Sequence, residues 1–287
     1  MDKLKKAFSI KYVFLFPAII WIAFFVVYPL FYTITVSFFE YRLGEGMTRF
    51  VLFGNYLDNF RNPDFWESLR ITFIFVAATI SVELVLGTFF AWLLSREIRF
   101  KGLFRTIFTA PIFTTVVAIG YLGVTMFHQT GGPVNYFLRK EIAWISDPFY
   151  ALLGIILLDI WRWTPFVFII MLAGFESIPI SFYENAYLDT KSDWRMFRHI
   201  TLPYLLPTIT IVLLFRLIRA FKVFGLAMSL TGGGPGTATQ VFSLLGYRTT
   251  IKFFDFGHGA AMAIIFLIIV MLIITRLIGT AVRDITE

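Results

Sequence analysis

The sequence contains no cysteine and few histidine or charged side chains. Of its 287 residues, none is cysteine, three are histidine and 15% are charged. Without cysteine the chain cannot form a disulfide, a thiolate-bound zinc or iron–sulfur site, or a thiol nucleophile. Soluble domains carry about 25% charged residues. The small charged fraction therefore argues against an ordinary soluble fold.

Motifs for nucleotide binding and hydrolysis are also missing. The chain has no GxxxxGK[ST], HExxH or GxSxG segment, so it lacks the usual phosphate loop, zinc-protease helix and nucleophile elbow. Its histidines, His128, His199 and His258, fall in three separate regions. We predict no catalytic site, no metal site and no cofactor in this chain. If ATP drives the protein, another chain must bind it.

Long apolar stretches dominate what the sequence does contain. Hydrophobic residues make up 58% of the chain, and the mean hydropathy is +0.79. A helix of about 20 apolar residues, rising about 1.5 Å per residue, crosses a bilayer core. We therefore predict an all-α polytopic membrane protein with six transmembrane helices in a domain from residue 13 to residue 279. The predicted spans are residues 13–38, 69–95, 106–127, 149–174, 204–230 and 258–279.

The remaining segments set the orientation. Residues 1–12 form a basic N-terminal segment, residues 175–203 a charged loop and residues 280–287 a tail. The first apolar run is too long for a signal peptide and lacks a small-residue cleavage site, so we expect a retained helix. Thirteen lysines and arginines lie on the side of both termini and the charged loop, against seven on the other side. By the positive-inside rule we expect both termini in the cytoplasm. This bias absorbs most of the net charge of +7, so no nucleic-acid partner is needed.

The charged loop has an amphipathic pattern. Ser181 followed three residues later by Glu184 is a capping box, which predicts a helix start. Ser192 can cap a second helix, in which Trp194 and Phe197 lie on one face. A proline after these positions, Pro203, predicts a helix boundary. We therefore expect two short helices at the membrane surface, suited to a soluble partner.

The spacing in this loop resembles a known family. A glutamate, an alanine two residues on, an aspartate at five, a phenylalanine at thirteen and a closing Ile-x-Leu-Pro mark the cytoplasmic loop of ABC importer permease subunits. The matching residues are Glu184, Ala186, Asp189, Phe197, Ile200, Leu202, Pro203 and Pro207. The resemblance implies a type I ABC importer permease architecture, in which this loop is a coupling helix that inserts into a separate ATPase. Glu184 would then contact the ATPase, Asp189 would shape the turn and Pro203 would fix the entry of the fifth span.

Two positions depart from the family pattern. Asn185 replaces the usual alanine, which is a mild change. Thr190 stands where glycine is usual, and a β-branched residue tolerates positive φ poorly. We therefore expect a different backbone conformation at this turn.

A glycine-rich loop after the fifth predicted span adds detail. Residues 230–235 read LTGGGP and resemble the larger permease of maltose-type carbohydrate importers, in the six-span form that many sugar and glycerol-phosphate importers have. Glycine permits tight turns and close backbone approach. Such a loop would fold back at the pathway mouth or meet a binding protein, whereas the alternative is a plain flexible turn. The exterior-loop candidates are Gly232, Gly233, Gly234 and Pro235.

The resemblance also implies partners and a location. The chain would be a multi-pass subunit of a prokaryotic inner membrane, forming half of the pathway for a sugar, a sugar phosphate or glycerol phosphate. Its partners would be a second homologous permease, a dimer of ATP-binding subunits that carries ATP and Mg²⁺, and an extracytoplasmic solute-binding protein. The chain itself would be no enzyme.

Several charged residues lie inside the predicted spans. Counted at about 1.5 Å per residue, most of these charges lie about 15–22 Å deep, where they usually face a bundle interior or a water path. Pairing one turn apart, or between helices, would only lock the bundle, whereas exposure to a pathway would let them bind sugar hydroxyls. Their excess of basic groups favours an anionic substrate. The pathway candidates are Glu83, Asp159, Trp161, Arg162, Trp163, Arg216, Arg219 and Lys222.

Two other functions compete with the importer reading. A secondary transporter driven by an ion gradient through Glu83 and Asp159 explains the buried charges but leaves the charged loop without a purpose. A membrane-embedded enzyme has no catalytic constellation to support it.

Overall fold

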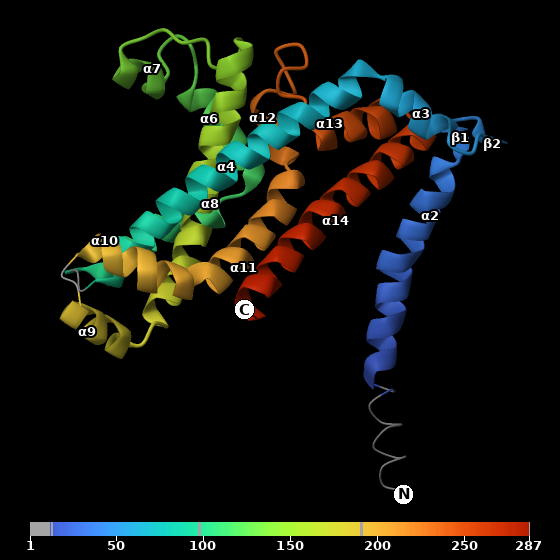
Figure 1. Ribbon diagram of the computed structural model, residues 1–287. Coiled ribbons are helices and arrows are strands. Elements are labelled where there is room, and N and C mark those ends of the chain that lie inside the picture. The colour runs from blue at the N-terminus through green and yellow to red at the C-terminus, as the bar shows by residue number, and fades with distance from the viewer. Residues whose placement is uncertain (1–11, 13, 97–98, 190–191, 287) are drawn as a thin grey trace, which may run out of the picture. The chain divides into compact units, whose positions relative to one another are not determined.

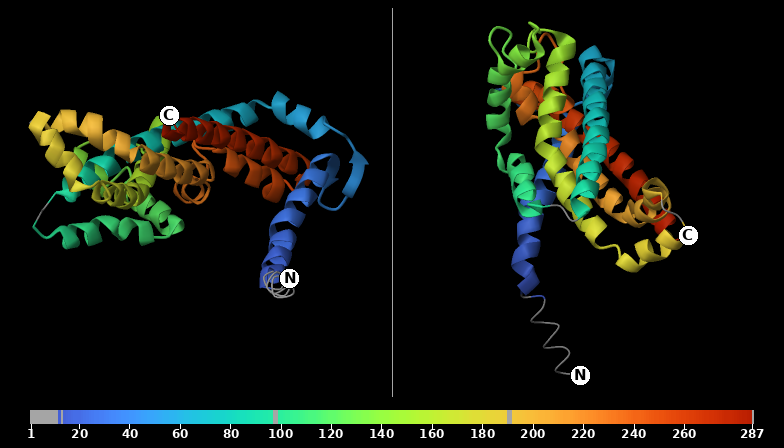
Figure 2. Two further views of the ribbon diagram at one scale, coloured as in Figure 1. Left: turned by 60° about the horizontal axis from the view of Figure 1, so that its bottom comes forward. Right: turned by 90° about the vertical axis from the view of Figure 1, so that its left-hand side faces the viewer.

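The computed structural model describes residues 12, 14–96, 99–189 and 192–286. The chain forms two compact units. Unit 1 comprises the segment up to Pro63 together with Gly246–Ile269, and unit 2 comprises Asp64–Leu245 together with the segment from Val270. Helices dominate both units (Figures 1 and 2).

Unit 1 combines apolar helices with one small sheet. An apolar helix covers Phe14–Ser37, and α3 and α14 follow later in the chain (Figure 1). The strands β1 and β2 pair antiparallel, with Phe39 opposite Phe50. The elements are η1 (Ala23–Val27), α2 (Tyr28–Ser37), β1 (Phe39–Arg42), β2 (Gly46–Phe50), α3 (Gly54–Arg61), η4 (Arg248–Lys252) and the first part of α14 (Phe256–Thr286).

The side chain of Asn55 fixes α3 to the hairpin. Its buried amide nitrogen donates to the carbonyl oxygens of Ser37 and Phe39, each at 2.9 Å. At Gly257 in α14, an added Cβ would lie 2.5 Å from the Phe39 carbonyl oxygen. Only glycine permits this close approach of helix and strand.

Unit 2 is a bundle of long apolar helices with short helices at its two ends. In Figure 1, α8 runs from the end that carries α7 to the end that carries α9, and Figure 2 shows the same course from the side. The loop after α12 lies at the α7 end. The helices are α4 (Pro63–Ser95), α5 (Lys101–Thr109), η2 (Ala110–Phe113), α6 (Val116–Met126), α7 (Pro133–Leu138), α8 (Pro148–Glu176), α9 (Ile180–Asp189), α10 (Asp193–Met196), η3 (Phe197–Thr201), α11 (Leu202–Phe221), α12 (Gly225–Leu230) and α13 (Phe242–Tyr247).

The core of unit 2 joins α4, α8 and α11. Ala91 of α4 packs with Phe168 of α8 and Leu205 of α11 in one buried apolar cluster. The helices approach closely because Gly87 lacks a side chain: an added Cβ would lie 2.6 Å from Val167. Five long helices, and a sixth if a bent pair counts as one, are apolar enough to span a membrane within the described residues. The prediction of an all-α polytopic fold is thus confirmed.

The third predicted span differs from a straight helix. Residues 106–127 were expected to form one span, but the structure bends by 97° between Lys101–Phe113 and Val116–Met126. Pro111 cannot donate a helical hydrogen bond, and Thr114 adopts an extended backbone. The Thr115 hydroxyl then caps the second helix by accepting from the Ala118 amide at 3.3 Å.

The fifth predicted span also has different ends. Residues 204–230 were expected, whereas a continuous helix runs over Trp194–Phe221 and α12 is separate. Pro203 was expected to mark a boundary, yet the helix continues through it. The π-helical turn η3 ends at Thr201, two residues before the proline, and changes the hydrogen-bond register next to the missing amide donor. The second and sixth helices are longer than predicted, starting at Pro63 and ending at Thr286.

Candidate functional site

The predicted coupling loop forms two helices, as the sequence indicated. Glu184 lies on α9 with its side chain exposed, and Trp194 on the second helix is 67% exposed. The Ser192 hydroxyl accepts from the Arg195 amide at 3.5 Å, which confirms it as the cap of α10. A side-chain hydrogen bond joins α9 to η3, between the Tyr183 and Thr201 hydroxyls at 3.2 Å.

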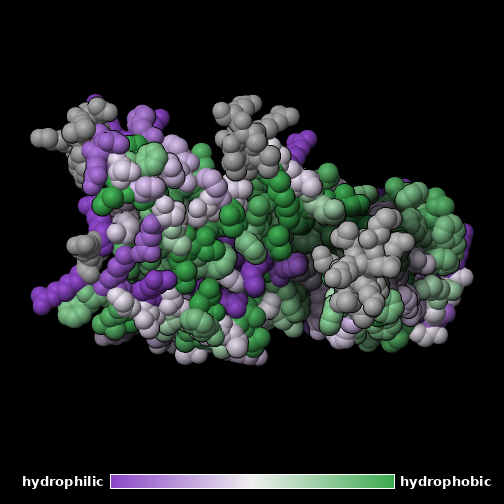
Figure 3. Space-filling model, turned by 90° about the horizontal axis from the view of Figure 1, so that it is seen from below, coloured by the Kyte–Doolittle hydropathy of each residue, from purple (hydrophilic) through white to green (hydrophobic). Residues whose placement is uncertain are grey.

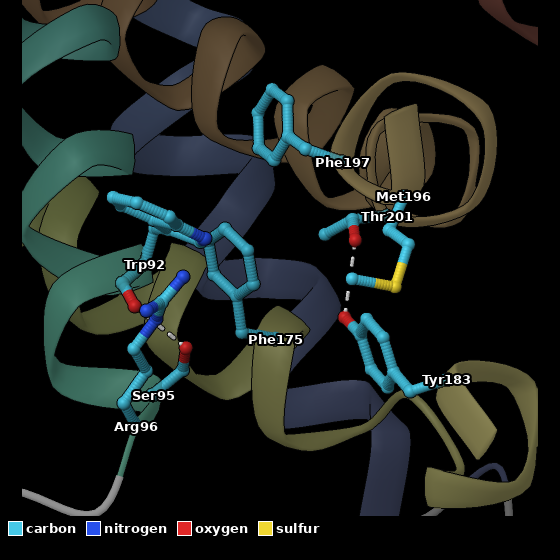
Figure 4. A pocket seen from close by; sticks show the side chains of 8 residues that line it. All are labelled: Trp92, Ser95, Arg96, Phe175, Tyr183, Met196, Phe197 and Thr201. Carbon is cyan, nitrogen blue, oxygen red and sulfur yellow. Dashed lines mark hydrogen bonds between the residues drawn. The ribbon is translucent and has the colours of Figure 1, made fainter. Parts of the chain in front are cut away.

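A pocket of about 350 Å³ separates this helical pair from the end of α4. Figure 4 shows Trp92 and Arg96 on one side and Tyr183 and Thr201 on the other. The Arg96 guanidinium lies 4.4 Å from the centroid of the Trp92 ring. Phe197, predicted for the coupling set, also lines the pocket and is half-buried. The space leaves the helical pair in contact with the bundle along only part of its length.

The surface of this end of unit 2 is more polar than its flank. Figure 3 shows hydrophilic side chains gathered at the end that carries α9 and α10, and apolar side chains over the flank beside it. This contrast fits a bundle whose flank lies in a membrane and whose end meets water.

Other predicted coupling residues have different surroundings. Leu202 is half-buried and Pro203 is exposed in the first turn of α11. Ala186 and Asp189 lie in α9, but their side chains are outside the described part of the chain. Thr190 is outside it altogether. The predicted effect of Thr190 on the turn therefore stays a prediction.

The buried charges form one cluster between α4, α8 and α11. Arg216 donates from Nε and Nη2 to the two carboxylate oxygens of Glu83 at 2.5 and 2.7 Å. Its Nη2 also donates to Asp159 Oδ2 at 2.8 Å. All three side chains are almost completely buried. Of the two pairings that the sequence left open, the interhelical one is found, and it locks three helices together.

A tryptophan beside this cluster contacts three arginines. The guanidinium carbons of Arg162, Arg216 and Arg219 lie 5.2, 4.9 and 4.9 Å from the ring centroid of Trp163. The Arg216 Nη1 atom has no hydrogen-bond partner among the described residues, and the electron-rich ring face lies beside its guanidinium. Trp163 is buried, so it packs in the bundle as well as holding these cations.

Arg162 and Arg219 differ from Arg216 in making no hydrogen bond to a carboxylate of the described residues. Neither makes an ion pair within the described part of the chain, and the Arg162 Nε atom is buried without a hydrogen bond there. Arg219 is exposed, Arg162 is half-buried and Lys222 is exposed at the end of α11. Trp161 is 46% exposed. The predicted pathway set is thus divided into a buried structural triad and a more open basic group.

The glycine-rich loop after α12 is compact. Gly232 and Gly233 have φ of 61° and 95°, which favours glycine. The Thr231 and Thr239 hydroxyls lie 2.7 Å apart, and Thr239 also donates to the Gly234 carbonyl at 2.7 Å. The loop is therefore held by its own hydrogen bonds, and its place at the pathway mouth stays a prediction.

Unit 1 carries a polar group at the start of α14. Asp255 accepts from the His258 amide at 3.1 Å and pairs with Arg42 at 3.5 Å. Burial alone would raise the pKa of Asp255, but hydrogen bonds from His258 and the charge of Arg42 together lower that pKa below its usual range. Among the described residues, no group of His, Asp and Glu side chains has the arrangement of a metal site.

Sequence reasoning did not identify several residues that organise these sites. Thr239 is fully buried and closes the glycine-rich loop. Thr72 of α4 accepts from the Phe242 amide at 2.8 Å and so holds α13 in place. Trp92 lies in the last turn of α4, and Arg96 directly follows the helix. Their four-residue spacing, which brings side chains to the same face of a helix, was the available sequence signal.

Comparisons with known proteins agree with this geometry. Residues 83–284 match the family model described as binding-protein-dependent transport system inner membrane component. The sulfoquinovosyl glycerol transport system permease protein SmoG of Agrobacterium fabrum is 33% identical, over 87% of this chain and 82% of that protein. The trehalose/maltose transport system permease protein MalF of Thermococcus litoralis is 30% identical, over 92% and 90%.

A solved structure has the same fold. A chain of a bacterial alginate ABC transporter, in complex with an alginate pentasaccharide-bound periplasmic protein, superposes with a TM-score of 0.85 at 23% identity. The match covers 96% of this chain and 95% of that one. The family model includes Glu83, Asp159 and Arg216 as well as the whole loop from α9 to η3. This chain therefore belongs to the family of binding-protein-dependent transport system inner membrane components.

Proposed function

We propose that this chain forms half of the membrane pathway of an ABC importer for a sugar or a related solute. The observation that carries the proposal is the family match, which spans both the charged bundle core and the helical loop. The relatives named for sulfoquinovosyl glycerol and for trehalose and maltose support a carbohydrate substrate. The second half of the pathway would be a related permease.

ATP is bound and hydrolysed by a separate subunit in this proposal. The chain contains no GxxxxGK[ST] segment with which to cradle phosphates. The ATPase dimer meets the pair α9 and α10, with Glu184 as the charged contact. Both termini and this pair lie in the cytoplasm, and the loop from Gly232 to Pro235 lies at the outer face, where a binding protein delivers the solute. Their positions at opposite ends of unit 2 support this arrangement.

Coupling follows from the continuity of the helix after the loop. When the ATPases close on ATP, the pair α9 and α10 moves with them. The helix over Trp194–Phe221 carries this displacement from the docking surface to Arg216, which touches α4 and α8. The bundle can then switch between inward-facing and outward-facing states, because each state binds a different form of the partners more tightly.

The energy source separates this function from an ion-driven transporter. The complex would be reconstituted in liposomes with its binding protein, and uptake of a radiolabelled trehalose, maltose or sulfoquinovosyl glycerol would be measured. We expect uptake to require ATP on the ATPase side and to persist when an ionophore collapses the proton and sodium gradients. Uptake that follows the ion gradient and ignores ATP would contradict the proposal and favour transport through Glu83 and Asp159.

A further inference from the structure

Arg162 and Arg219, the basic residues beside Trp163, carry more positive charge than the bundle fully neutralises. Arg216 makes ion pairs with Glu83 and Asp159, whereas no described carboxylate lies within ion-pair distance of Arg162 or Arg219. Asp159 also attracts Arg162 electrostatically, so the two carboxylates offset two of the three arginine charges and one positive charge is left over. Both unpaired guanidinium carbons lie within 5.2 Å of the same ring centroid, so they are at most about 10 Å apart. Two cations at this separation can grip one anionic group between them.

The depth of these arginines restricts what they can face. Arg162 is the middle residue of α8, which runs over Pro148–Glu176, and Arg219 reaches the same depth because it touches Trp163. A charged side chain at the middle of a span avoids hydrocarbon and faces a protein or a water-filled path. Arg219 is exposed on the surface of unit 2, so it faces a neighbouring protein or a water-filled path and not the core of its own bundle.

Aromatic surface adjoins the two cations. Trp163 lies between them, and the neighbouring Trp161 presents a ring that is 46% exposed. A sugar ring has apolar faces that can lie on an aromatic ring, while an acidic substituent reaches a guanidinium. Arg216 cannot bind the acidic substituent in the same way, because its guanidinium is already hydrogen-bonded to Glu83 and Asp159.

We propose that Arg162 and Arg219 bind the anionic group of an acidic sugar, a carboxylate, sulfonate or phosphate, on the translocation path. This inference rests on the proposed function, since it requires that the face carrying these residues lines the path. It narrows the substrate class from sugars in general to sugars with a negative charge. Each charged hydrogen bond lost from such a site should weaken binding by about tenfold.

The test is ligand-observed NMR on the complete complex in lipid nanodiscs. Saturation transfer would be measured to glucuronate, to glucose 6-phosphate and to neutral glucose, for the native chain and for the double variant Arg162→Gln/Arg219→Gln. The matched control is Arg139→Gln/Lys140→Gln, which removes two exposed charges from the loop after α7. The two acidic probes separate carboxylate from phosphate recognition.

We expect an acidic probe to bind at least tenfold more tightly than glucose to the native complex and to the control. The double variant should lose this preference and keep its weak affinity for glucose. Equal binding of all probes to the native complex would overturn the inference, as would an unchanged preference in the double variant. Dissociation of the second permease from the double variant would also overturn it, by assigning the two arginines to the subunit interface.

The ATPase rate of the same samples separates this inference from the proposed function. A native complex that hydrolyses ATP but shows no preference for acidic sugars retains its importer function and loses only the anionic subsite. If the chain copurifies with no ATPase, the proposed importer function itself is contradicted.

Discussion

Arg216 stabilises the buried carboxylates of unit 2. It supplies the positive charge for two buried carboxylates that come from different helices. Removal of one partner from a buried ion pair costs about 3–5 kcal/mol, because an uncompensated charge remains. Here two buried carboxylates would remain.

Arg216→Ala should therefore lower the yield and thermal stability of the folded protein, before any effect on transport. The combined variant Glu83→Gln/Asp159→Asn/Arg216→Met, which removes all three charges of the triad, should recover much of the lost stability. Thermal unfolding of the purified complexes measures both. A fully stable Arg216→Ala protein with reduced transport would instead place this side chain on the pathway.

The contact between α4 and α8 shows how the close packing of two helices depends on a glycine. At Gly87 of α4, an added Cβ would lie 2.6 Å from Val167 Cγ1 and 3.0 Å from the Phe168 amide nitrogen. The valine is β-branched and the amide belongs to the backbone, so neither can move far. The helices α4 and α8 would have to separate.

Gly87→Ala should destabilise the bundle by about 1–3 kcal/mol through overpacking. The control is Gly102→Ala in α5, where an added Cβ meets nothing within 4 Å; this change should leave stability the same or slightly higher, because alanine favours helix. Denaturation midpoints of the two variants give the comparison. Equal midpoints would show that the contact at Gly87 is not a tight one.

The elements also show what the sequence can and cannot predict. Apolar length alone predicted the long helices, and depth counting along them predicted that Glu83, Asp159 and Arg216 would gather. The choice of partner was not predictable, since pairing depends on the rotation of each helix about its axis. The bend before α6 was not predicted, because the hydropathy of a segment does not report the direction of its helix axis. Pro111 and the Thr114–Thr115 pair were the local sequence signals for this bend.

The coupling loop was predicted as two helices but not as part of a longer one. Proline usually ends a helix, so Pro203 indicated a boundary. The π-helical turn η3 absorbs the missing donor and keeps α10 and α11 continuous. In the proposed coupling mechanism this continuity matters, because a rigid helix transmits a displacement better than a hinge.

For the whole molecule, the account requires opposite ends of unit 2 to face opposite sides of the membrane. The chain has no cysteine, so single cysteines can report exposure without a background. Ser181→Cys on α9 and Thr237→Cys in the glycine-rich loop both replace exposed residues. In intact cells an impermeant maleimide should label Thr237→Cys and should reach Ser181→Cys only after permeabilisation. The reverse labelling pattern would invert the proposed orientation.

Copurification with the driving ATPase tests the central claim, that this chain passes the energy of a separate ATPase to a membrane pathway. The tagged chain would be purified gently from its native membrane, as the native sequence and as Glu184→Lys, with Glu141→Lys as a control at another exposed glutamate. Native and control chains should bring a second permease and an ATPase that drive ATP-dependent uptake, whereas Glu184→Lys should lose the uptake. Recovery of the native chain alone, or full transport by Glu184→Lys, would contradict the account.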